Sequence, residues 1–156
     1  MAAHEPVETL VALLRRTSRQ MVDELIERLH AAGYADHTAA HHPLFENIDP
    51  EGTRLTVLAS RTGLTHQAVG ELIDALEQRG YVERFPDRSD ARARLVRLTK
   101  KGRAAVRTAI AEIARIEAEW MAVWRQAGLR GNLRAALKAG LRTAPPRRVR
   151  RTHPRS

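Results

Sequence analysis

The sequence contains no cysteine, few aromatic residues and no long apolar run. Its 156 residues include only 2 Trp, 2 Tyr and 2 Phe. Without cysteine the chain has no disulfides, thiolate metal sites or cysteine nucleophiles. No apolar run approaches the ~18 residues that a membrane-spanning helix needs. Met1–Pro6 also lacks the basic, apolar and small-residue segments of a secretory signal, so we expect a cytoplasmic protein.

Sequence motifs of common enzyme classes are missing as well. There is no glycine-rich phosphate loop, no His-Glu-x-x-His pair and no nucleophile elbow. We therefore expect neither an enzyme nor a cofactor. With 43% apolar and 29% charged residues, the composition is that of an ordinary globular protein.

Acidic residues are scarce where basic residues gather. The net charge is +9, and residues 1–78 carry −6, residues 79–103 carry +6, residues 104–144 carry +4 and residues 145–156 carry +5. Codon bias explains the excess of Arg over Lys but not the scarcity of acids in one block. The distribution favours a nucleic-acid-binding surface over general solubility.

Long amphipathic helices are expected near both ends of the chain. Apolar residues recur at three- and four-residue steps over Pro6–Ala32 and again from Thr99 to about Arg125, and a shorter helix is expected over 132–142. A long apolar stripe needs a long surface to cover it, and a chain of this length offers few. We therefore expect a partner subunit.

Two short helices joined by a tight turn are predicted in the middle of the chain. The first covers residues 54–62, and Gly63 forms the turn. Thr65 is a suitable N-cap for the second helix, which ends at Gly80. One face of this second helix is apolar, with Val69, Leu72, Ile73 and Leu76. Such a pair is a helix-turn-helix, whose second helix can enter a major groove.

A β-hairpin with a charged tip is predicted directly after these helices. Strand-like segments at residues 81–85 and 94–98 enclose the charged segment 86–93. The hairpin contains Asp90-x-Arg92, then Arg94-Leu-Val-Arg-Leu-Thr, then Gly102. Behind a helix-turn-helix, this motif and its spacing resemble the MarR family of winged-helix transcriptional regulators over residues 55–102.

The resemblance implies a homodimer in which the N-terminal and C-terminal helices intertwine and hold two winged helix-turn-helix units over a pseudopalindromic double-stranded DNA operator. The two apolar-striped helices agree with an isologous interface. The half-sites should then lie about one helical turn apart, roughly 34–36 Å.

We expect a mainly α fold with a small β-hairpin wing. Residues 1–50 form the N-terminal dimerisation helix and a linking helix, and residues 51–98 form the winged helix-turn-helix domain. Residues 99–144 form the C-terminal dimerisation helices, and residues 145–156 form a basic tail that is disordered without DNA.

In the second helix of the motif, the apolar positions leave five residues to face the groove: Thr65, His66, Gln67, Gly70 and Glu71. Gln67 can read adenine through its amide, Thr65 suits a phosphate or a thymine methyl, and His66 suits either. Phosphate would repel Glu71 unless it accepts from a cytosine amine, so it is not assigned to the site.

In the hairpin, Arg92 is the leading minor-groove residue, because a narrow groove concentrates negative potential. Arg88 and Arg94 are expected to contact phosphates. Asp90 is expected to hold Arg92 or Arg94 in position, and the family pattern implies that Asp74 shares this role. Three further cations could contact phosphate or only solvent: Arg84, Arg97 and Lys100.

An effector cavity is a further implication of the resemblance. Its expected wall residues are Tyr34, His41, Phe45 and Trp120, although aromatic residues at helical spacing are more often plain core. His37, His41, His42 and Glu46 have spacings that can ligate zinc. Without cysteine or a second histidine cluster, we expect no metal.

The resulting hypothesis is a dimeric repressor that an apolar or phenolic small molecule releases from its operator. The alternative is a basic architectural protein that coats nucleic acid without regard to sequence. Both predict a steep dependence of binding on salt, so only the ratio of specific to random DNA affinity separates them.

Overall fold

The structure, a computed structural model, describes residues 8–143. The expected helix start at Pro6 and the expected basic tail, 145–156, lie outside the described residues. The chain divides into two compact units, Met1–Glu119 and Trp120–Ser156, which are described separately.

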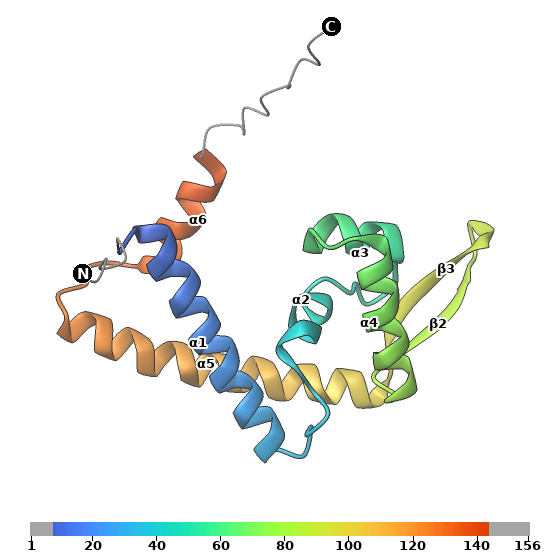
Figure 1. Ribbon diagram of the computed structural model, residues 1–156, viewed down its shortest axis with the longest axis horizontal. Helices are drawn as coiled ribbons and strands as arrows, with labels where there is room; N and C mark the ends of the chain where they lie inside the picture. The colour runs from blue at the N-terminus through green and yellow to red at the C-terminus, as the bar shows by residue number, and fades with distance from the viewer. Residues whose placement is uncertain (1–7, 144–156) are drawn as a thin grey trace, which may run out of the picture. The chain divides into compact units, whose positions relative to one another are not determined.

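The first unit contains most of the secondary structure (Figure 1). In chain order its elements are α1 (Leu10–Ala31), the 3-10 helix η1 (Ala39–His41), α2 (His42–Phe45), β1 (Thr53–Arg54), α3 (Leu55–Thr62), α4 (His66–Gln78), β2 (Val82–Asp87), β3 (Asp90–Leu98) and α5 (Lys100–Gln126), which runs into the second unit. The strands form an antiparallel sheet in the order β1-β3-β2. The predicted fold class is confirmed, and β1 is a strand that the sequence did not reveal.

The first helix begins at Leu10, four residues later than predicted. Thr9 has extended backbone angles, and its hydroxyl accepts a hydrogen bond from the Ala12 amide at 3.2 Å, so it caps the helix. Near its other end, Arg28 donates to Glu119 at 2.6 Å and lies 3.5 Å from Glu112. These contacts connect α1 to α5.

The helix-turn-helix forms as its local signals predict. Gly63 ends α3 with a φ of +72°, a conformation that favours glycine. The Thr65 hydroxyl then accepts from the Ala68 amide at 3.1 Å and caps α4, and Gly80 follows the helix with a φ of +74°.

A single apolar core joins α2, α3, α4, the sheet and the start of α5. Its largest member is Tyr81, whose side chain is fully buried while its hydroxyl donates to Asp36. The other members of the core are Leu44, Phe45, Ile48, Leu58, Ala59, Val69, Ile73, Leu76, Val82, Val96 and Ala105. Three of the four apolar residues predicted to face inward from α4 are therefore fully buried, and Leu72 packs beside them.

The hairpin is longer than predicted and its turn is tighter. Pairing continues to Asp87 and Asp90, so the turn itself is only Arg88-Ser89. The pairs Pro86 with Arg94 and Asp87 with Asp90 leave residues 91–93 as a bulge in β3. The expected eight-residue tip was wrong, because Asp87 folds the turn back by accepting hydrogen bonds from both the amide and the hydroxyl of Ser89.

The start of α5 lies very close to Tyr81, the residue that precedes β2. The Thr99 hydroxyl accepts from the Gly102 amide at 3.1 Å and donates to the Gly80 carbonyl at 2.6 Å. A Cβ atom on Gly102 would lie 2.0 Å from the Tyr81 carbonyl oxygen. The backbones meet there only because residue 102 has no side chain.

The described part of the second unit contains the C-terminal end of α5 and the whole of α6 (Leu133–Thr143). The Asn132 side chain caps α6 by accepting from the Ala135 amide at 2.9 Å. None of the residues of α6 is buried, and Leu141 is 82% exposed. Within the described part of the chain, no helix combines the length and the apolar character needed to cross a membrane.

Candidate nucleic-acid interface

The first turn of α4 presents a polar surface. Thr65, His66 and Gln67 are all exposed, whereas Val69 and Ile73 are fully buried on the opposite face. The first amides of a helix lack partners within the helix, and the helix dipole makes this end partially positive. The exposed turn is thus suited to face a polyanion.

Further along the same face, Glu71 lies one helical turn after Gln67. The Gln67 amide nitrogen donates to the Glu71 carboxylate at 3.0 Å, and both side chains are exposed. Gly70, between them, has room for a side chain, because its Cβ would meet only the Leu55 Cδ2 atom, at 4.0 Å. The chain's own packing therefore does not require glycine at position 70.

The arginines around the hairpin fall into two groups. Arg54 donates to Asp87, Arg97 donates to Glu83 at 2.8 Å, and Arg84 donates to both Asp74 and Glu77. The other group is Arg88, Arg92 and Arg94. All three side chains are exposed, and none has an acidic partner among residues 8–143. Their charge is available to an external anion.

Asp87 anchors the hairpin turn to β1. Its carboxylate accepts from Ser89 and, on its other oxygen, from the Arg54 Nε atom at 2.8 Å. Hydrogen bonds from the Ser89 hydroxyl and amide, and then from Arg54, lower the pKa of Asp87 to about 2. The turn that carries Arg88 is therefore fixed by an ionised carboxylate with four donors. Neither Arg54 nor Asp87 was predicted from the sequence to be part of the site, although Asp-x-Ser is a recognisable turn signal.

The two aspartates expected to position the wing have separate contacts. Asp90 accepts from the Arg92 backbone amide at 3.1 Å and lies 3.9 Å from Arg54. Asp74 accepts from Arg84 at 2.6 Å and so links α4 to β2. Asp90 thus contacts the residue it was assigned to, through the backbone, whereas Asp74 contacts a different arginine.

The geometry is a helix-turn-helix from which the β2-β3 hairpin projects (Figure 1). The hairpin carries the exposed Arg88, Arg92 and Arg94. Residues 36–93 match the model of the MarR family. Over this segment the chain is similar to MarR-family proteins. A comparison with curated proteins gave no match.

Solved structures of MarR-family regulators share the fold over most of the chain. CouR from Rhodococcus jostii RHA1 bound to p-coumaroyl-CoA superposes with a TM-score of 0.70 at 21% identity, covering 90% of this chain and 94% of CouR. CouR bound to a 23-mer DNA duplex gives 0.67 at 27% identity, with 92% and 96% covered. A MarR variant from E. coli in complex with operator DNA gives 0.68 at 24% identity, with 88% and 94% covered. These structures are of transcriptional regulators, the class of protein that the sequence predicted for this chain.

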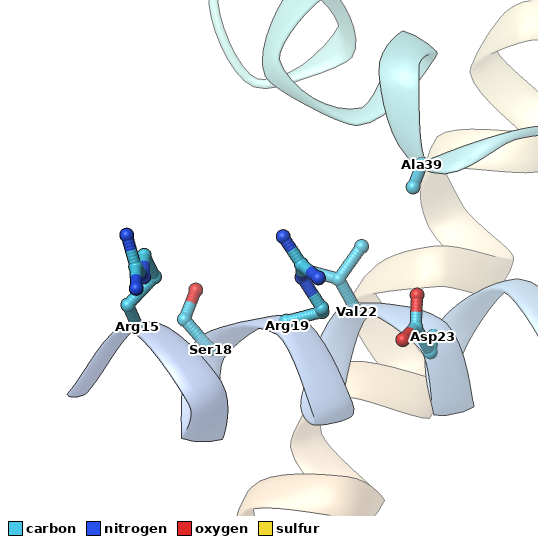
Figure 2. A pocket seen from close by; sticks show the side chains of 6 residues that line it. All are labelled: Arg15, Ser18, Arg19, Val22, Asp23 and Ala39. Atoms are coloured by element: carbon cyan, nitrogen blue, oxygen red, sulfur yellow. The ribbon is translucent and has the colours of Figure 1, made fainter. Parts of the chain in front are cut away.

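The chain also has an open hollow of about 550 Å³ beside α1, named here the α1 hollow. Figure 2 shows its lining side chains on one face of α1, opposite Ala39 of η1. The lining residues are Arg15, Ser18, Arg19, Val22, Asp23 and Ala39. The guanidinium groups of Arg15 and Arg19 suit the anionic part of a ligand, and Val22 and Ala39 suit an apolar part, while the Asp23 carboxylate lies on the same lining.

The residues expected to line an effector cavity lie elsewhere. His41 and Phe45 are buried, and Tyr34 packs against the same core, its ring centroid 6.4 Å from that of Tyr81. Trp120 belongs to the second unit, where its ring lies 5.5 Å from that of Trp124. Three of the four residues therefore contribute to core packing in the first unit.

The histidines of the same region have separate roles. The His41 Nδ1 atom accepts from the Thr38 amide at 3.2 Å and closes a capping box at η1, while His42 pairs with Glu46 at 3.2 Å. His37 is buried and stacks on Phe45, with ring centroids 4.8 Å apart. Among the residues that the structure describes, no group of three or more His, Asp or Glu side chains is arranged to hold a metal ion.

Proposed function

We propose that the chain is a homodimeric, sequence-specific DNA-binding regulator in which α4 enters a major groove and the β2-β3 hairpin reaches the adjacent minor groove. The observation that carries this proposal is that some arginines around the hairpin have acidic partners and others do not. Arg88, Arg92 and Arg94 remain unpaired on the projecting hairpin, while neighbouring arginines are neutralised. Unpaired guanidinium groups on a projecting β-ribbon suit a polyanion whose groove admits the ribbon.

Each exposed group has a role that its chemistry supports. Gln67 reads a base edge, and Thr65 and His66 contact a phosphate or a base from the positive end of α4. On the hairpin, Arg92 enters the minor groove and Arg88 and Arg94 contact phosphates. Asp90 and Asp74 keep the wing in position, through the Arg92 amide and through Arg84 respectively.

The homodimer is supported by apolar surface that one chain leaves uncovered. Large apolar side chains are exposed on α1, α5 and α6, including Val11 at 74%, Ile110 at 62% and Leu141 at 82%. Exposed apolar surface on three helices is typical of an intertwined isologous interface. Residues 1–50 and 99–144 would then supply dimerisation and residues 51–98 the DNA contacts.

The proposed effector is the apolar or phenolic small molecule of the sequence-based hypothesis, and it also carries an acidic group. The α1 hollow supports the acidic group through Arg15 and Arg19 and the apolar body through Val22 and Ala39. Such a ligand lowers operator affinity only if it binds more tightly to the conformation in which the two recognition helices do not match the operator. On this basis the protein is a repressor that its effector releases.

The test of sequence specificity is to select fragments from a genomic DNA pool with the purified protein at physiological salt. Recovery of a pseudopalindrome supports the dimeric regulator. An unenriched pool supports the architectural alternative, and the base-reading roles of His66 and Gln67 would then be withdrawn.

The test of the wing is the Arg92→Ala variant, with Arg97→Ala as the matched control. Arg92→Ala should weaken operator binding by about 1–3 kcal/mol with the dimer intact. Arg97→Ala should change it much less, because Arg97 is already paired with Glu83 in the free protein. Titration of labelled operator measures the affinity and size-exclusion chromatography the dimer. Unchanged binding by Arg92→Ala would remove the wing from the mechanism.

A further inference from the structure

A glutamine side chain can recognise adenine only when its amide group is in the correct orientation. In the major groove adenine offers an acceptor, N7, beside a donor, the N6 amine. A glutamine amide matches this pair with its carbonyl oxygen toward N6 and one N–H toward N7. Rotated by half a turn it presents the opposite pattern, and a free glutamine on a helix surface adopts both orientations.

In this structure a second residue fixes the orientation. The Gln67 Nε2 atom donates to Glu71 Oε1 at 3.0 Å. An ionised carboxylate only accepts hydrogen bonds, so it holds the nitrogen of the amide and not the oxygen. The amide has two N–H groups. The one pointing away from the carbonyl oxygen can bond Glu71, which leaves the other N–H beside the oxygen as the donor and acceptor pair that adenine requires.

The charge of Glu71 has a second effect. It is exposed on the same face of α4 as Gln67, the face that the proposed function directs into the groove. A carboxylate there is repelled by phosphates, whatever the base sequence, and so weakens non-specific binding. On the operator, part of this cost is offset by the hydrogen bonds of the correctly oriented Gln67.

We propose that Glu71 is a specificity-determining positioning residue, which orients the Gln67 amide for adenine and disfavours DNA that lacks adenine at that position. The inference rests on the proposed function, in that α4 must enter the major groove.

The test uses the full-length protein and the operator recovered from the genomic pool. The first step identifies the A·T pair that Gln67 reads. Replacing this pair by G·C weakens DNA binding by the parent protein but does not weaken binding by Gln67→Ala. Affinities for the operator, for the replaced operator and for random DNA are then measured for Glu71→Gln, Glu71→Ala and the double variant Gln67→Ala/Glu71→Ala. Glu51→Gln, which removes the same charge from an exposed turn, is the control.

Both Glu71 variants should bind random DNA more tightly than the parent and should lose about fivefold or more of the discrimination between A·T and G·C. In the Gln67→Ala background the loss of Glu71 should leave this discrimination unchanged. Glu51→Gln should retain the parent's discrimination. Discrimination by Glu71→Ala equal to that of the parent would overturn the inference. Failure to recover any operator would instead refute the proposed function, so the two failures are distinguishable.

Discussion

Two helical glycines of this protein should respond in opposite ways to the same substitution. Gly102 of α5 and Gly70 of α4 both lack the positive φ that marks the turn glycines, so alanine is compatible with the backbone at each. Their surroundings differ. A Cβ on Gly102 would lie 2.0 Å from the Tyr81 carbonyl oxygen, whereas one on Gly70 would meet only a methyl group, at 4.0 Å.

The magnitude of each effect follows from these distances. Cβ atoms essentially never approach closer than 3.0 Å, so in Gly102→Ala the start of α5 must move away from Tyr81 by about 1 Å. This movement stretches the hydrogen bonds that Thr99 donates to Gly80 and Tyr81. Overpacking costs about 1–3 kcal/mol and each lost hydrogen bond about 1 kcal/mol, against a helix-propensity gain of at most ~1 kcal/mol. Gly102→Ala should thus lower the free energy of unfolding by about 2–3 kcal/mol.

Gly70→Ala should raise the free energy of unfolding by about 0.4–1 kcal/mol, because alanine restricts the unfolded chain and favours the helix. Urea denaturation at a fixed protomer concentration measures both variants, since the stability of a dimer depends on concentration. A Gly102→Ala protein as stable as the parent would refute the reasoning from the close approach. If Gly70→Ala is stabilised yet binds operator poorly, the glycine serves DNA contact instead of folding.

The other predictions concern pH and the effector. Burial, and then the neighbouring histidines, lower the pKa of His37 to about 4, so between about pH 6.5 and 4 the unfolded chain binds a proton that the folded chain does not. Its contribution to the free energy of unfolding, roughly 3 kcal/mol, is present above pH 6.5 and is lost as the pH falls to 4. When the free energy of unfolding is measured by urea titration across this pH range, His37→Phe should depend less steeply on pH than the parent. An equally steep dependence would contradict the assignment to His37. For the effector, Arg19→Ala should abolish the thermal shift and operator release caused by an aromatic acid, but Arg16→Ala, which lies outside the α1 hollow, should not. Equal responses to the acid and to its neutral amide in the parent protein would exclude the arginines as the ligand's anchor.

Element boundaries were predictable wherever one residue and its nearest neighbours decide them. Thr65 and Thr99 start helices by accepting an amide three residues ahead, and Gly63 and Gly80 end them through positive φ. The length of the hairpin was not predictable in this way. It depends on Asp87, whose partner Arg54 lies 33 residues away in sequence.

The distinction between free and neutralised arginines also needed the structure. Arg97 and Glu83 face each other because the strands pair in that register, and Arg84 reaches Asp74 and Glu77 because α4 packs beside β2. Neither contact has a local signal in the sequence. The scarcity of acidic residues predicted a basic block of residues, but only the cross-strand register shows which of its cations have no acidic partner among residues 8–143.

The contacts of Arg84 have a consequence for the shape of the operator. One guanidinium joins two acids of α4 to β2 at the base of the hairpin. If α4 and the hairpin enter DNA grooves as proposed, these ion pairs fix the separation between them. Within one half-site, the distance between the bases that α4 contacts in the major groove and the minor groove that the hairpin enters is then fixed. Variation among operators should be confined to the identity of the bases and to the central spacer between half-sites. Insertions inside a half-site should abolish recognition even where every contacted base is retained.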